Sequence, residues 1–112
     1  MKKAIFAVLL LLVAIIFISG CVKTTESPPK STTATVIIQN ASFNPQNITV
    51  KAGTTVIWEN KDPFTHDVTI DNGMFNSDVN ATESISFTFS QPGEYPYHCD
   101  IHTFMHGKVT VQ

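Results

Sequence analysis

From residue 34 onward, apolar and polar residues alternate along the chain, which is the pattern of β-strands with one buried face. The clearest alternation places Ile85, Phe87 and Phe89 on one side, with serine and threonine between them. Seven runs rich in β-forming residues are separated by turn residues: Thr35–Gln39, Ile48–Lys51, Thr54–Trp58, Asp67–Ile70, Ser84–Phe89, Glu94–Cys99 and Lys108–Val111. No helical period follows residue 34. The pattern predicts an all-β fold, a Greek-key antiparallel β-sandwich of about seven to eight strands with Trp58, Phe87 and Phe89 in its core.

The N-terminal segment has a different pattern. Lys2 and Lys3 precede an uncharged apolar run from Ala4 to Ile18, which is the form of a secretory signal. The run is shorter than the roughly 20 residues that a membrane span needs. The junction Ile18-Ser19-Gly20-Cys21 resembles a lipoprotein processing site, at which the cysteine receives a lipid and becomes the new N-terminus. We expect a signal peptide over residues 1–20, with an uncleaved anchor helix as the alternative, and both place the following residues outside the cytoplasm at a membrane.

Residues 21–33 are expected to form a flexible linker behind the lipid on Cys21, because they combine polar residues with Pro28-Pro29 and have little apolar content. The predicted domain, residues 34–112, contains three lysines, no arginine and eight acidic residues. This acidic balance argues against nucleic acid as a partner. It permits a protein partner with a basic docking surface.

The two cysteines, Cys21 and Cys99, could form a disulfide outside the cell. A lipid on Cys21 excludes this pairing and leaves Cys99 as a single thiol, which would oxidise in an exported protein unless something protected it. Metal ligation would protect it. The local sequence supports this interpretation, because His102 and Met105 follow Cys99 at steps of three in a loop that begins at a strand end.

Thiolate, imidazole and thioether together suit copper and do not suit magnesium or calcium. A second imidazole is available from His66, which begins a β-run after a turn. Two histidines and one cysteine with a weak axial methionine form a type 1, or blue-copper, donor set. The predicted ligands of one copper ion are therefore His66, Cys99, His102 and Met105.

Two further histidines lie beside this loop. His98 alternates with Cys99 along the strand and should point to the opposite face, so we do not expect it to bind metal. His106 follows Met105 and gives a Cys-x-x-His-x-x-x-His alternative that zinc could use.

The segment Trp58–His66 and the loop from Tyr97 to Val109 resemble the cupredoxins of the plastocyanin and amicyanin type. The Cys-x-x-His-x-x-Met spacing is most similar to amicyanin, and the resemblance spans roughly Phe43 to Val111. It implies that both histidines bind through Nδ1 and that His102 presents its other edge to solvent. It also implies an apolar docking patch around that edge, formed by Phe64, Phe104 and Met74.

The sequence departs from the family at two places in the site. Asp67 follows the first histidine, where many relatives have asparagine, and a carboxylate there should alter the hydrogen bonds between the ligand loops. Ile101 and Thr103 flank His102, where amicyanin-like loops often carry prolines. Their free N–H groups could donate to the Cys99 sulfur or to loop carbonyls and so tune the reduction potential.

Four protein donors leave no open coordination position for a substrate, which favours an electron carrier over an enzyme. We expect a monomeric, membrane-anchored carrier on the extracytoplasmic face, which exchanges electrons with a redox protein donor and acceptor through the exposed edge of His102. The alternative is a copper-binding or copper-delivery protein at the cell surface. Three glycosylation sequons begin at Asn40, Asn47 and Asn80, and their use depends on the cell.

Overall fold

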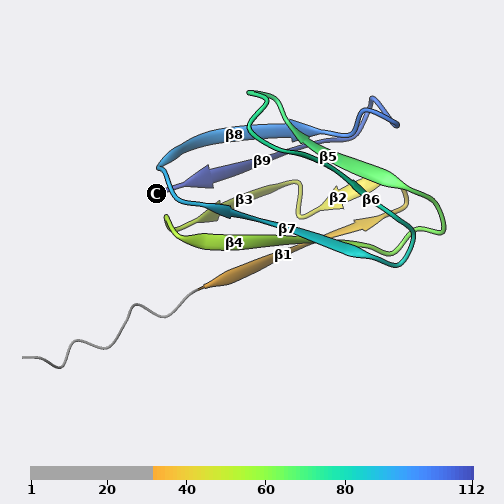
Figure 1. The fold of residues 1–112 in the computed structure, drawn as a ribbon, viewed down its shortest axis with the longest axis horizontal. Coiled ribbons are helices and arrows are strands. Elements are labelled where there is room, and N and C mark those ends of the chain that lie inside the picture. The colour runs from red at the N-terminus through yellow and green to blue at the C-terminus, as the bar shows by residue number, and fades with distance from the viewer. Residues whose placement is uncertain (1–31) are drawn as a thin grey trace, which may run out of the picture. The chain divides into compact units, whose positions relative to one another are not determined.

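Strands form almost everywhere that the sequence alternates. The computed structural model describes residues 32–112, and the predicted signal peptide and nearly all of the predicted linker lie outside them. Among residues 32–112 there is no helix long and apolar enough to cross a membrane. These residues form nine strands arranged as two sheets (Figure 1).

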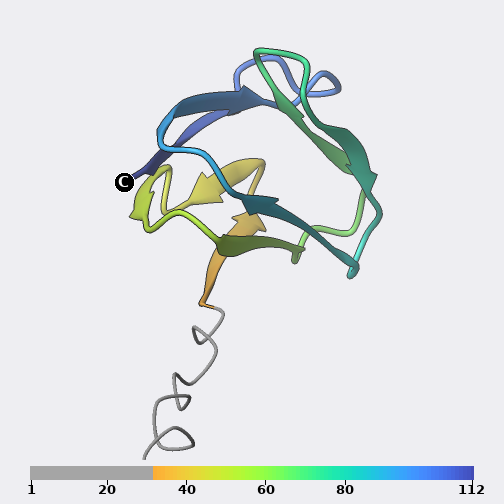
Figure 2. The same ribbon diagram turned by 60° about the vertical axis from the view of Figure 1, so that its left-hand side comes forward.

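The two sheets differ in size and enclose the core between them (Figure 2). The four-stranded sheet has the order β2-β1-β4-β7, with bounds β1 Thr33–Gln39, β2 Ser42–Asn44, β4 Thr54–Asn60 and β7 Ser84–Phe89. The five-stranded sheet has the order β3-β9-β8-β5-β6, with bounds β3 Asn47–Val50, β5 His66–Ile70, β6 Asn76–Val79, β8 Gly93–His98 and β9 His106–Val111. The predicted all-β sandwich is therefore confirmed.

Two details of the prediction are corrected. The sheets are mixed, because β1 pairs in parallel with β4 and β3 pairs in parallel with β9. The structure also adds two short strands, β2 and β6, that the sequence pattern did not predict. Both are polar apart from one residue each, Phe43 and Val79, so they show too little alternation to stand out from turns.

The core follows the predicted alternation. Trp58 and Phe89 are fully buried, while Phe87 is only partly buried and packs against the same cluster. In β7 the intervening serine and threonine residues face solvent. The apolar residues of both sheets thus meet in one interior, as expected for a β-sandwich.

The turn between β1 and β2 has an unusual backbone. Gln39 pairs with Ser42, so the turn consists of Asn40 and Ala41, and both have positive φ, 54° and 52°. Two positive φ values are the geometry of a type I′ hairpin turn, which normally uses glycine at the second position. Ala41 holds this conformation without glycine, and a buried carboxylate accepts hydrogen bonds from both N–H groups of the turn.

Two loops lie at the same end of the sandwich, opposite the C-terminus (Figure 1). One runs from the end of β4 at Asn60 to the start of β5 at His66, and the other runs from the end of β8 at His98 to the start of β9 at His106. All four predicted ligands lie in these loops or at their ends.

Candidate metal centre

The loop between β8 and β9 is closed by its own backbone. His98 pairs with His106 across the two strands, so the connection runs from Cys99 to Met105. Cys99 N–H donates to the Met105 carbonyl at 3.2 Å, and Met105 N–H donates to the His102 carbonyl at 3.0 Å. These bonds form a tight turn, which brings Cys99, His102 and Met105 close together.

His66 is positioned by the loop that precedes it. It is the first residue of β5 and is fully buried. The side chain of buried Asn60 fixes the loop, because its amide donates to the carbonyls of Phe64 and Val79 at 2.8 and 3.0 Å and its oxygen accepts from Asp62 N–H at 2.9 Å. The loop therefore holds the His66 ring in a fixed position beside the loop between β8 and β9.

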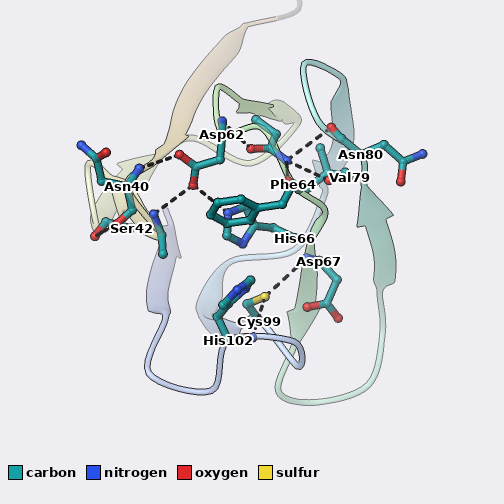
Figure 3. A network of polar contacts seen from close by, with 12 residues as sticks. Asn40, Ser42, Asp62, Phe64, His66, Asp67, Val79, Asn80, Cys99 and His102 are labelled. Carbon is teal, nitrogen blue, oxygen red and sulfur yellow. Dashed lines mark hydrogen bonds and ion pairs between the residues drawn. The ribbon is translucent and has the colours of Figure 1, made fainter.

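The two loops bring three of the predicted ligands together. One ligand atom each from His66, Cys99 and His102 lies within 4.8 Å of the others (Figure 3). The rings of His66 and His102 have centroids 4.7 Å apart. His66 and Cys99 are fully buried, and His102 is partly exposed.

Both imidazoles have a buried nitrogen without a hydrogen-bond partner among the described residues. It is Nδ1 in His66 and Nδ1 in His102. A buried polar atom without a partner is costly, so such atoms call for an explanation. Two unpartnered imidazole nitrogens beside a thiol sulfur form the donor set that a copper ion takes in a trigonal type 1 site, and the residues therefore fit that ion.

The Cys99 sulfur accepts two backbone N–H groups. Asp67 N–H lies 3.5 Å and His102 N–H lies 3.4 Å from Sγ. Burial raises the pKa of the Cys99 thiol, while these N–H groups act in the opposite direction. Without a cation the site therefore favours the neutral thiol, and a bound metal ion would compensate the buried thiolate.

Two backbone N–H groups of the loop between β8 and β9 act on the Cys99 sulfur. His102 N–H lies 3.4 Å from it, and the Ile101 N–H, one of the two donors expected from the absence of proline, also acts to lower the pKa of Cys99. The tight turn from Cys99 to Met105 directs these N–H groups back to the cysteine.

Asp67 ties the two ligand loops together, as expected. Its carboxylate accepts a hydrogen bond from Asp100 N–H through Oδ1 and one from the Thr69 hydroxyl through Oδ2 at 3.0 Å. The Thr69 hydroxyl also lies 3.1 Å from Asp100 Oδ2. A carboxylate thus makes the link between the loops through acceptor atoms alone.

The remaining predicted residues occupy different positions. Met105 is buried, with 2% of its surface exposed, at the end of the loop. His106 is exposed, and the group of converging ligand atoms does not include it. His98 lies outside that group too, since its two ring nitrogens contact Asp71 at 2.6 Å and Asp100 at 2.9 Å.

Apolar side chains surround the exposed edge of His102. Phe64 and Phe104 flank its ring with centroid distances of 5.5 and 6.1 Å, and they are 45% and 70% exposed. Ile101, the residue before His102, is 53% exposed. Large exposed apolar side chains gathered at one place are typical of a docking surface. Met74 is 46% exposed in the turn between β5 and β6, and its place in the expected patch stays a prediction.

Asp62 is a site residue that the sequence analysis missed. It is nearly buried, and its Oδ2 lies 2.7 Å from His66 Nε2. Its position four residues before His66 is an available signal, but an acidic residue beside a proline in a turn is too common to indicate a role.

A β-sandwich with a histidine, cysteine and histidine converging at one end defines a class of mononuclear copper proteins. The cupredoxin-like domain family matches residues 8–111, and the chain therefore belongs to this family. The family confirms the predicted resemblance, and together with the donor set it confirms one type 1 copper ion as the cofactor.

Known proteins of this family resemble the chain over most of its length. Amicyanin-alpha of Methylorubrum extorquens is 31% identical over 100 residues, which cover 84% of this chain and 83% of that protein. Amicyanin of Paracoccus versutus is 32% identical over 81 residues, which cover 67% of this chain but only 61% of that protein. The crystal structure of amicyanin from Paracoccus versutus superposes with a TM-score of 0.66 at 29% identity, covering 78% of this chain and 86% of that one.

Proposed function

We propose that this protein is a membrane-anchored electron carrier outside the cytoplasm, with one copper ion held by His66, Cys99, His102 and Met105. The observation that carries the proposal is the convergence of His66, Cys99 and His102, whose ligand atoms lie within 4.8 Å of one another and whose two imidazoles each have an unpartnered buried Nδ1. When bound, a type 1 copper ion supplies a one-electron couple between Cu(I) and Cu(II). A related solved structure, at 30% identity and a TM-score of 0.65, is described as the Cu(I) form of an amicyanin variant.

Each of the four proposed ligands would bind the copper ion through a different donor atom of the chain. His66 and His102 would bind through Nδ1, Cys99 through Sγ, and buried Met105 would supply a weak axial thioether. Two strand-anchored loops hold the donors, and their hydrogen bonds would limit movement when the charge of the site changes. Four protein donors leave no open position for a substrate, which supports a carrier rather than an enzyme.

His102 would be the exit for electrons, because it is the ligand with an exposed edge. Phe64 and Phe104 beside it would exclude water from the contact with a redox partner. The acidic domain would steer partners that have a basic docking surface. We expect the carrier to act as a monomer, so that this end of the sandwich stays open to both donor and acceptor.

Visible absorption of the full chain in detergent, titrated with Cu(II), tests the copper site. We expect an intense band from thiolate-to-copper charge transfer that the Cys99→Ser variant lacks and the control His98→Gln retains. A colourless wild-type complex would refute the proposal. Rapid loss of copper to a strong chelator would instead favour the alternative, copper delivery at the cell surface.

The membrane anchor depends on residues outside the described part of the chain and is tested separately. If a lipid on Cys21 holds the protein at the membrane, Cys21→Ser should move it to the soluble fraction after cell breakage, whereas Cys99→Ser should stay with the membrane. Retention of the Cys21→Ser protein in the membrane would favour the uncleaved anchor helix.

A further inference from the structure

We propose that Asp62 is a positioning residue of the metal centre. Its carboxylate sets the tautomer and orientation of the His66 ring and links that ring to the β1–β2 turn. The inference deepens the proposed function and rests on it for the identity of the metal. The geometric argument concerns the chain alone.

The contact between Asp62 and His66 determines where the ring proton lies. Asp62 Oδ2 is 2.7 Å from His66 Nε2, and the two side chains are 6% and 0% exposed (Figure 3). An ionised carboxylate accepts hydrogen bonds and cannot donate them, so the shared proton belongs to Nε2. Nδ1 then keeps its lone pair, and His66 Nδ1 is the buried ring nitrogen that has no hydrogen-bond partner among the described residues.

The surroundings of Asp62 keep its carboxyl ionised. The backbone N–H groups of Asn40 and Ala41 point at its two oxygens, and because an N–H group can only donate, both oxygens must act as acceptors. The carboxylate can therefore act as an acceptor towards His66 under ordinary conditions.

Three donors converge on the two oxygens of this carboxylate. Oδ1 accepts from Asn40 N–H at 2.8 Å, and Oδ2 accepts from Ala41 N–H at 2.9 Å in addition to His66. An asparagine would have one acceptor oxygen and an NH₂ group that must face a donor. Only a carboxylate can accept all three hydrogen bonds at this position.

The same carboxylate therefore joins a strained turn to a candidate ligand. Asn40 and Ala41 adopt positive φ, which costs free energy for residues other than glycine. Their two N–H groups fix Asp62 on one side, and His66 lies on its other side (Figure 3). A carboxylate that accepts from the outer nitrogen of a ligating histidine fixes the ring and increases its basicity.

The first test uses the full chain without metal. Long-range ¹H–¹⁵N correlation spectra of ¹⁵N-histidine-labelled protein report which ring nitrogen carries the proton. We expect Nε2–H for His66 in the wild type and a shift towards Nδ1–H in Asp62→Asn. Nδ1–H in the wild type would overturn the proposal, and this measurement decides the question even if the variant does not fold.

The second test measures Zn(II) affinity by competition with a chelator. Loss of such a partner typically costs roughly 10- to 100-fold in metal affinity, and we expect that loss in Asp62→Asn. The matched control is Asp78→Asn, which removes the same charge from an exposed position on β6 and should bind like the wild type. A folded Asp62→Asn protein with unchanged tautomer and Zn(II) affinity would also overturn the proposal.

The two proposals can fail independently. If the wild type shows Nε2–H and the affinity loss occurs, but Cu(II) gives no intense visible band, the copper function fails and the role of Asp62 stands. If the band appears but the His66 tautomer does not depend on Asp62, the copper function stands and the role of Asp62 fails.

Discussion

Gly107 illustrates how closely the strands pack beneath the candidate site. It faces Tyr97 across β8 and β9, and a Cβ at Gly107 would come within 2.3 Å of the Tyr97 ring. The ring has little room to move, because it lies against Trp58 and Phe43 with centroid distances of 5.5 and 4.8 Å. Burial also raises the pKa of Tyr97 to about 12. Glycine is therefore required by packing at this position.

At the residue scale, we predict that Gly107→Ala destabilises the metal-free protein by roughly 1–3 kcal/mol, the usual cost of overpacking a core. Denaturant unfolding measures this loss. Combining it with Tyr97→Leu should cost less than the sum of the two single variants, because the smaller side chain leaves room for the methyl group. Strict additivity, or a Gly107→Ala variant as stable as the wild type, would contradict this account.

At the scale of elements, the candidate site consists of two loops whose flanking strands β5 and β8 pair with each other, and a side chain adds a further link between them. Asp67, at the second position of β5, holds the Asp100 backbone in the other loop through its carboxylate. The carboxylate also accepts a hydrogen bond from the Thr69 hydroxyl, so each of its two oxygens is hydrogen-bonded. This side chain therefore reinforces the relative position of the loops, beside the pairing of β5 with β8.

We predict that Asp67→Ala lowers the free energy of unfolding by about 1–3 kcal/mol, because it leaves the Asp100 N–H without its acceptor. Asp67→Asn keeps one acceptor oxygen for that N–H, so its loss should be much smaller. Denaturant unfolding of both variants checks this. Equal losses would show that the charge, and not the hydrogen bond, holds the loops.

A second connection at this scale joins β8 to the turn after β5. His98 contacts Asp71 and Asp100 through its two nitrogens, at 2.6 and 2.9 Å. The hydrogen bond with Asp71 is the largest influence on the His98 pKa, and together with Asp100 it outweighs burial and raises that pKa above its ordinary value. The charged imidazole is thus favoured in the folded state.

Because the folded-state pKa of His98 is raised, its stabilising contribution is complete below the unfolded value of about 6.5 and is lost as pH rises through the folded value. We predict that Asp71→Asn lowers the His98 pKa in an NMR titration. The stability difference between this variant and the wild type should be larger at about pH 6 than well above the folded value. A difference that does not change with pH would contradict the charged pair.

At the scale of the whole molecule, the sandwich brings together ligand atoms that are distant in the sequence. His66 is the first residue of β5, and Cys99 directly follows β8. These two strands are neighbours in the five-stranded sheet. The unfolded chain has no such arrangement, so a metal ion should bind the folded state and stabilise it by mass action.

We predict that metal at a free concentration of 100 times Kd raises the free energy of unfolding of the full chain by about 2.7 kcal/mol. The unfolding midpoint should rise accordingly. Thermal or denaturant unfolding with and without Zn(II) measures the effect. The Cys99→Ser variant is the control and should gain much less. An equal gain in both proteins would indicate binding elsewhere.

The sequence by itself determined the seven alternating strands, the core positions of Trp58 and Phe89, and the ligand loop. These features are local. A strand follows from period-two alternation, and the ligand loop is marked by Cys99, His102 and Met105 at intervals of three residues. Tertiary structure decided the parallel pairings of β1 with β4 and of β3 with β9, which no local pattern encodes. It also decided that Asp62 meets His66 and that Asp67 N–H donates to the Cys99 sulfur, since those contacts depend on how the folded loops pack.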